Sequence, residues 1–157
     1  MKKIQLSGFL GKYIKQILFL VVVVVAWTVL SPRLLRGGTE LRMDYLDDRI
    51  RLEVTGAEEP YMSEIPYAAI QKVETAYTLD LGSVVTGVQY RNLWFGVWTN
   101  EAYGEYSLYV MPSLDTYCVI TAENRVYVLN IQTKADTESF TVALRQLLED
   151  KGFPLSI

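Results

Sequence analysis

One long apolar segment stands apart from the rest of the chain. Residues 17–30 read ILFLVVVVVAWTVL and contain no charge, no glycine and no proline. With the four residues before it, the segment covers residues 13–30, and Lys15 is its only charge. At about 1.5 Å per residue, a helix of this length spans roughly 27 Å, close to the ~30 Å hydrocarbon core of a bilayer. The pattern predicts one transmembrane helix, flanked by four basic side chains: Lys12, Lys15, Arg33 and Arg36.

From Thr39 onward, apolar and polar residues alternate, as they do in half-buried strands. The alternation runs through residues 40–45 and 49–54. The polar pair Asp47-Asp48 between them predicts a turn, so we expect a hairpin with one solvated face. The acidic, proline-containing residues 56–63 indicate an exposed loop. Further extended segments are expected at residues 65–79, 84–90, 93–99, 106–111, 116–121 and 125–131.

Near the C-terminus the period becomes helical. Apolar residues recur at i, i+3, i+4, i+7 and i+8 from Phe140 to Leu148 and form one stripe. Asp136 is placed to cap the first turn, and Gly152 and Pro154 end the helix. No helical segment of similar strength separates the strands, which argues against a parallel βαβ arrangement. We therefore expect a mainly β (α+β) fold, in which a bent antiparallel sheet or roll of about seven strands is capped by this helix.

The charges divide the chain into two parts. Residues 1–36 contain six basic residues and no acidic one, whereas residues 37–157 contain nine basic and 18 acidic residues. We predict a basic N-terminus with its transmembrane helix (residues 1–36) and a β domain of net charge −9 (residues 37–157). Because so acidic a domain repels phosphate backbones, we expect no nucleic acid as a partner, and contact with the bilayer is left to residues 13–30.

The residues around the apolar segment also predict its orientation. No small-residue cleavage site follows it, which favours a retained anchor over a cleaved signal peptide. Four basic residues precede the uncharged residues 17–30 and two follow them. This bias favours a single-pass protein of the cell membrane, with its N-terminus in the cytoplasm and its C-terminal domain outside.

The residues that carry most enzyme chemistry are missing. The chain has no histidine and a single cysteine, Cys118, which excludes histidine-dependent triads, histidine-ligated metals and an intrachain disulfide. Cys118 and Arg125 resemble the pair used by sortases, but those enzymes need a histidine, so we interpret Cys118 as a buried apolar residue. Five carboxylates lack the spacing of a catalytic pair or a calcium loop and indicate a solvated acidic surface: Asp44, Asp47, Asp48, Glu58 and Glu59. We expect no catalytic residue, no cofactor and no metal.

An aromatic run is the most promising recognition feature. It comprises Tyr90, Trp94, Phe95, Trp98, Tyr103, Tyr106 and Tyr109. Strand alternation places Trp94 and Trp98 on one face of the sheet and Phe95 on the other, so both faces are apolar. One interpretation makes these rings core residues and cross-strand pairs. In the other, some of them face outward and bind a partner, with Trp94, Trp98 and Tyr103 as the candidates.

The order of elements resembles that of bacterial pleckstrin-homology (PH)-like domains. The resemblance rests on Ile65-Pro66-Tyr67 followed by Ile70 and Val73, on the region of Gly87 and Gly96, and most strongly on Tyr117–Leu148, which reads YCVITAENRVYVLNIQTKADTESFTVALRQLL. It covers about residues 39–150 and implies a PH-like roll, often joined to membrane helices, without catalytic residues. Related eukaryotic modules bind phosphoinositides through basic clusters at the first hairpin. Here that hairpin turns on Asp47-Asp48, so we expect no phosphoinositide ligand.

Three hypotheses for function follow. The first is a membrane-anchored, non-enzymatic PH-like interaction module that binds a protein or peptide partner at the membrane. The second is an accessory or assembly subunit that packs against a transporter or against its own copies. The third, a membrane-anchored hydrolase or transpeptidase, requires a pocket with convergent polar groups.

Overall fold

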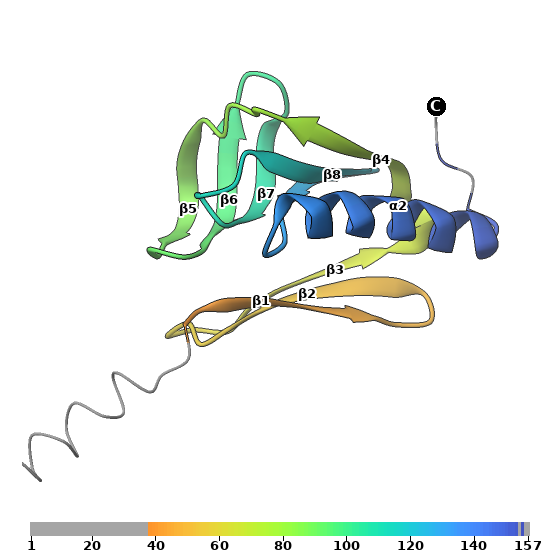
Figure 1. The fold of residues 1–157 in the computed structure, drawn as a ribbon, viewed down its shortest axis with the longest axis horizontal. Helices are drawn as coiled ribbons and strands as arrows, with labels where there is room; N and C mark the ends of the chain where they lie inside the picture. The colour runs from red at the N-terminus through yellow and green to blue at the C-terminus, as the bar shows by residue number, and fades with distance from the viewer. Residues whose placement is uncertain (1–37, 154, 156–157) are drawn as a thin grey trace, which may run out of the picture. The chain divides into compact units, whose positions relative to one another are not determined.

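The computed structural model describes residues 38–153 and residue 155. Nine strands and one α-helix follow one another in this part of the chain (Figure 1). Strands β1, β2 and β3 form one sheet, and the other six strands form a second sheet in the order β4-β8-β9-β7-β6-β5. The bounds are β1 Glu40–Tyr45, β2 Arg49–Thr55, β3 Tyr61–Pro66, β4 Ile70–Tyr77, β5 Ser83–Gln89, β6 Trp94–Asn100, β7 Gly104–Val110, β8 Thr116–Ala122, β9 Arg125–Leu129 and α2 Lys134–Asp150; a short 3₁₀ helix, η1 Tyr67–Ala69, joins β3 to β4.

The three-stranded sheet begins with the predicted hairpin. β1 and β2 pair antiparallel, and Ile50, Leu52 and Val54 are buried at alternate positions of β2. The expected loop at residues 56–63 is only partly correct, because β3 begins at Tyr61 and pairs with β2. The alternation of apolar and polar residues does not reveal this strand. Its inward-facing positions include the polar Ser63, and its outward-facing positions include the apolar, exposed Met62.

The six-stranded sheet contains one strand pair that differs from the predicted antiparallel arrangement. β7 and β9 run parallel, whereas we expected an entirely antiparallel sheet. The reason is the placement of the β8–β9 hairpin, which lies between β4 and β7 with β9 next to β7. The chain therefore skips one strand position after β7 and fills that position with β9. The fold is two sheets with nine strands in the described residues, rather than one bent sheet of about seven.

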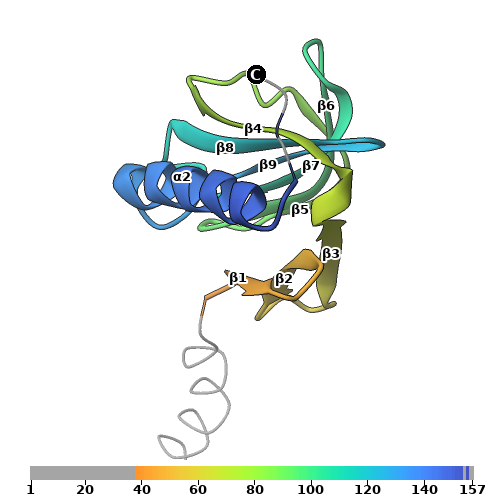
Figure 2. The same cartoon turned by 90° about the vertical axis from the view of Figure 1, so that its right-hand side faces the viewer.

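The predicted C-terminal helix is present as α2, and it packs against β8 and β4 (Figures 1 and 2). Its stripe of Phe140, Leu144 and Leu148 shares one hydrophobic core with buried residues of both sheets. The mainly β fold with one C-terminal helix is thus confirmed.

The ends of α2 show how local sequence sets its length. The N-cap is Thr133 rather than the expected Asp136: the Thr133 Oγ1 accepts a hydrogen bond from the Asp136 backbone N–H at 3.1 Å and donates one to its carboxylate at 2.6 Å. At the other end, Gly152 has φ +80°, and the Phe153 N–H donates to the Leu148 carbonyl. This is a Schellman ending, and it places the stop at the predicted glycine.

The N-terminal predictions fall on another part of the chain. The predicted span at residues 13–30 and its flanks Lys12, Lys15, Arg33 and Arg36 lie outside the described residues. Within the described residues, no helix combines the length and the apolar character needed to cross a bilayer.

Candidate functional site

The aromatic candidates lie on the face of the six-stranded sheet that points away from α2. Trp98 is 2 % exposed and belongs to a second apolar cluster there. Trp94 is partly buried and stacks on Trp98, with ring centroids 5.4 Å apart and planes inclined by 10°. Tyr103, also partly buried, meets Tyr106 edge to face at 5.8 Å. The three side chains therefore belong to one cluster, in which Trp98 offers a partner almost no surface.

The chain itself covers much of this second face. The connection from β4 to β5 joins the two edge strands of the sheet, and its Leu79 and Leu81 pack against the cluster. The Tyr106 hydroxyl donates a hydrogen bond to the Leu81 carbonyl at 2.7 Å, and the Asn100 side-chain amide donates one to the Asp80 carbonyl at 2.7 Å. The second apolar face of the sheet is thus largely covered by another segment of the same domain.

The arginines of the first hairpin are paired with carboxylates. Arg49 and Arg51 both donate to Glu64 at 2.8 Å, and Arg49 also reaches Asp48 at 2.7 Å. Hydrogen bonds from Arg51 and then Arg49 lower the pKa of Glu64, and the hydrogen bond from Arg49 lowers that of Asp48. Ion pairs, rather than free positive charge, therefore occupy this surface of the three-stranded sheet.

Cys118 and Arg125 do not form a reactive pair. The thiol is fully buried beneath α2 in the main core, and burial raises its pKa to about 12. Arg125 lies near the turn end of the β8–β9 hairpin and donates to the Ser107 hydroxyl at 3.1 Å. In the part of the chain that the structure describes, no group of histidine, cysteine or carboxylate side chains is arranged to hold a metal ion.

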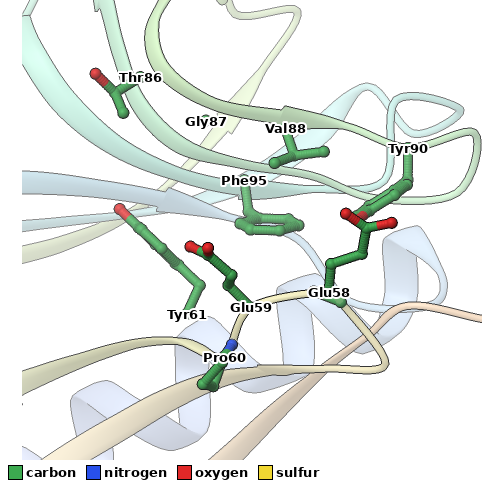
Figure 3. Close-up of a pocket in the computed structure, with 10 residues that line it drawn as sticks. Glu58, Glu59, Pro60, Tyr61, Thr86, Gly87, Val88, Tyr90 and Phe95 are labelled. Carbon is green, nitrogen blue, oxygen red and sulfur yellow. The ribbon is translucent and has the colours of Figure 1, made fainter.

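A cavity of about 370 Å³ opens between the β2–β3 loop and strands β5 and β6 (Figure 3). We call it the β5 cleft. Its inner wall is Phe95, which is 3 % exposed, with the rings of Tyr61 and Tyr90 5.4 Å and 6.0 Å from the Phe95 ring. The other lining residues are Ala57, Glu58, Glu59 and Pro60 from the loop and Thr86, Gly87 and Val88 from β5.

The β5 cleft combines an apolar wall with an acidic rim. Glu58 and Glu59 project from the loop toward the space in front of Phe95 (Figure 3). Among the residues that the structure describes, no lysine or arginine lines the cavity. The Tyr61 phenol is protonated at neutral pH, as tyrosine ordinarily is, and can donate a hydrogen bond; burial raises its pKa further. The cleft therefore suits an apolar side chain that ends in a cationic group.

The sequence contained parts of this site without revealing their proximity. The sequence pattern places Glu58 and Glu59 in a solvated loop, and Tyr90 and Phe95 in an aromatic run more than thirty positions away. The loop meets β5 and β6 only because the two sheets share one core. The one local signal was the pairing of glycines, Gly87 opposite Gly96, in a region otherwise rich in aromatic side chains.

Comparison with known proteins places the chain in a family. Searches of curated proteins and of solved structures found no match. The sequence model of the family described as "Bacterial PH domain" matches residues 43–148, which is more than half of the chain. The match runs from the first hairpin to the end of the apolar stripe on α2 and includes every strand that lines the β5 cleft. The chain therefore belongs to the bacterial PH domain family.

Proposed function

We propose that this protein is a membrane-anchored, non-enzymatic module that binds a protein or peptide partner at the membrane through the β5 cleft. The observation that carries the proposal is the cavity itself, with Phe95 as its apolar wall and two glutamates at its rim. A polypeptide side chain with an apolar stem and a polar end has the matching chemistry. Tethering rests on the apolar residues 13–30.

Charge favours a polypeptide over a phosphorylated lipid. A phosphoinositide headgroup needs convergent cationic donors, but Arg49 and Arg51 are already paired with Glu64. At the cleft, Glu58 and Glu59 would repel a phosphate group. The basic bias before residue 17 favours display of the domain on the outer side of the membrane.

Site-specific crosslinking in native membranes tests the function. A photoreactive residue is placed in the full chain at Val88 in the cleft, with Val142, exposed on α2, as a matched position away from it. We expect a discrete protein adduct from Val88 and none from Val142. Absence of a protein adduct at every exposed position examined would contradict an interaction module.

Two further readouts refine the result. One constant partner, or adducts between copies of the chain, would instead support an accessory or assembly subunit. Protease treatment of intact cells tests the orientation: we expect cleavage of residues 38–157 from outside, and full protection would place the domain on the cytoplasmic side.

A further inference from the structure

The four edge strands of the two sheets differ in how they are protected against pairing with another chain. An edge strand presents unpaired N–H and C=O groups, and proteins usually guard it with charges, proline or a covering element. β1 contains Glu40, Arg42 and Asp44, and β3 contains Glu64 and ends at Pro66. β4 contains the ion pair of Lys72 and Glu74. β5, with the sequence SVVTGVQ, contains no charge and no proline.

The unguarded strand is also the most accessible one. Every residue of β5 is exposed, and Val85 and Val88 retain 50 % and 40 % of their accessible surface. β5 pairs only with β6, so its other edge has no partner strand within the described residues. An exposed apolar edge without a charge is the geometry by which sheets bind an extended peptide.

The register of β5 indicates which groups such a peptide would meet. The Tyr90 N–H donates to the Leu93 carbonyl at 3.0 Å, and the opposed pairs continue as Val88 with Phe95 and Thr86 with Val97. Because hydrogen-bonded and non-hydrogen-bonded positions alternate in an antiparallel ladder, Gly87 and Gln89 direct their backbone N–H and C=O groups toward the free edge. Thr86 and Val88 line the β5 cleft, so the edge and the cleft are continuous.

We infer that an extended segment of a partner polypeptide adds to β5 as a further strand and places a lysine or arginine side chain in the β5 cleft beside Glu58 and Glu59. This inference rests on the proposed function and specifies its partner. Backbone hydrogen bonds to Gly87 and Gln89 supply part of the affinity, and alternate side chains of the added strand face the cleft. The apolar stem of the basic residue lies against Phe95, and its charge reaches the acidic rim.

Charge argues against a second copy of this chain as the added strand. Pairing of β5 with β5 would bring together two domains that each carry a net charge of −9 and two acidic rims. It would leave both clefts without a basic side chain, since β5 has none. Arg91, in the turn after β5, lies outside the cleft lining and is the nearest basic residue in sequence.

The test uses the full chain in lipid nanodiscs and a displayed library of random peptides of about 12 residues, long enough to cover one strand. We expect the selected peptides to share a basic residue flanked by β-branched residues and to slow amide exchange at Gly87 and Gln89. The double change Glu58→Gln/Glu59→Gln should weaken their binding about tenfold or more, whereas Glu101→Gln/Glu123→Gln, at exposed carboxylates elsewhere, should not. N-methylation of alternate peptide amides should abolish binding in one register only.

Three results would overturn the inference. They are failure to select any binding peptide, selected peptides that protect a surface other than β5, and a β5 edge occupied by a second copy of the chain in nanodiscs at working concentration. If the native partner crosslinks at Val142 but not at Val88, the inference and the cleft assignment both fail while an interaction module remains. If no position crosslinks to a protein, the proposed function fails as well.

Discussion

The two edge strands of the six-stranded sheet, β4 and β5, differ in their contacts with the rest of the domain. β4, at one edge, is held by α2: the Arg145 guanidinium donates to the Val73 carbonyl at 2.6 Å, the Tyr77 hydroxyl donates to Glu138 at 2.9 Å, and the Lys134 ammonium lies 4.9 Å from the centre of the Tyr77 ring. β5, at the other edge, contains no charge, and among residues 38–153 no helix packs against it. The two edges of one sheet therefore differ: α2 contacts β4 and bonds one of its backbone carbonyls, whereas β5 is exposed and uncharged.

Thiol reactivity provides the largest contrast between the two sides. Cys118 lies on β8, the neighbour of β4, beneath α2, and its pKa is raised to about 12 by burial. We expect alkylation at pH 8 to be at least about a thousandfold slower in the native chain than in the urea-unfolded chain, because the thiol reacts only after the domain opens. A Val88→Cys substitution in a Cys118→Ala background should react at nearly the unfolded rate. Equal alkylation rates at positions 118 and 88 in the native chain would show that the two sides of the sheet do not differ in accessibility.

High pH should reduce the stability of the domain through the same thiol, that of Cys118. Folding raises the pKa of Cys118, so its contribution to stability is present below the pKa of the unfolded thiol and is lost as the pH rises toward about 12. The urea midpoint of the native chain should therefore fall more steeply above pH 9 than that of the Cys118→Ala variant. If the urea midpoints of the two proteins fall in parallel with pH, the Cys118 thiol does not contribute to the loss of stability.

The attachment of β5 depends on two opposed glycines. A Cβ at Gly96, where φ is +128°, would lie 2.3 Å from the Thr86 carbonyl oxygen and 2.5 Å from the Gly87 Cα. We expect Gly96→Val to reduce the free energy of unfolding by at least about 3 kcal/mol, because β5 and β6 must separate. Gly104→Asn is the matched control, since Gly104 also has positive φ but open space around it, and it should cost less than about 1 kcal/mol. Both are measured by urea unfolding of the full chain in detergent.

Loss of the contact between α2 and β4 should reduce the free energy of unfolding by less than Gly96→Val does. Arg145→Met retains much of the side-chain length but loses the hydrogen bond to Val73, so we expect a loss of about 1 kcal/mol and faster amide exchange along β4. Gln146→Met, at the adjacent exposed position, should leave exchange in β4 unchanged. If Arg145→Met also leaves it unchanged, the helix does not guard this edge.

A charge on the open edge should have the smallest effect on stability. Val85 lies at an irregularity in the β5–β6 register, with its side chain half exposed. Val85→Lys should change the free energy of unfolding by less than about 0.5 kcal/mol while weakening peptide binding at β5. Val142→Lys, on α2, should be equally stable and bind normally. A large loss of stability from Val85→Lys would show that β5 packs more tightly than its exposure indicates.

Local patterns predicted the elements better than their partners. The alternation in residues 40–54, the extended segments that became β8 and β9, and the stripe on α2 all correspond to structure, because each is set by neighbours in sequence. The parallel pairing of β7 with β9 could not be read this way, since it depends on where the β8–β9 hairpin inserts. Thr133 was missed as N-cap because the acidic residue at the third helical position is an equally common signal.

The candidate site shows the same limit. Alternation correctly separated Trp98 from Phe95, one in each apolar cluster, but it could not show that the connection after β4 covers the face of Trp98. Nor could it show that Glu58 and Phe95 line the same cavity. Sequence thus indicated which side chains share a face, whereas the covering of each face depends on contacts between distant segments.

The strand order places different demands on the folding of the two edges. β5, β6 and β7 are consecutive hairpin neighbours, so they require only short loop closures. β4, by contrast, pairs with β8, and about forty residues must be brought together before Tyr77 meets Thr116. We expect refolding to form the β5–β7 meander early and to dock β4 late. A newly made chain would then present its β5 edge before its opposite edge exists.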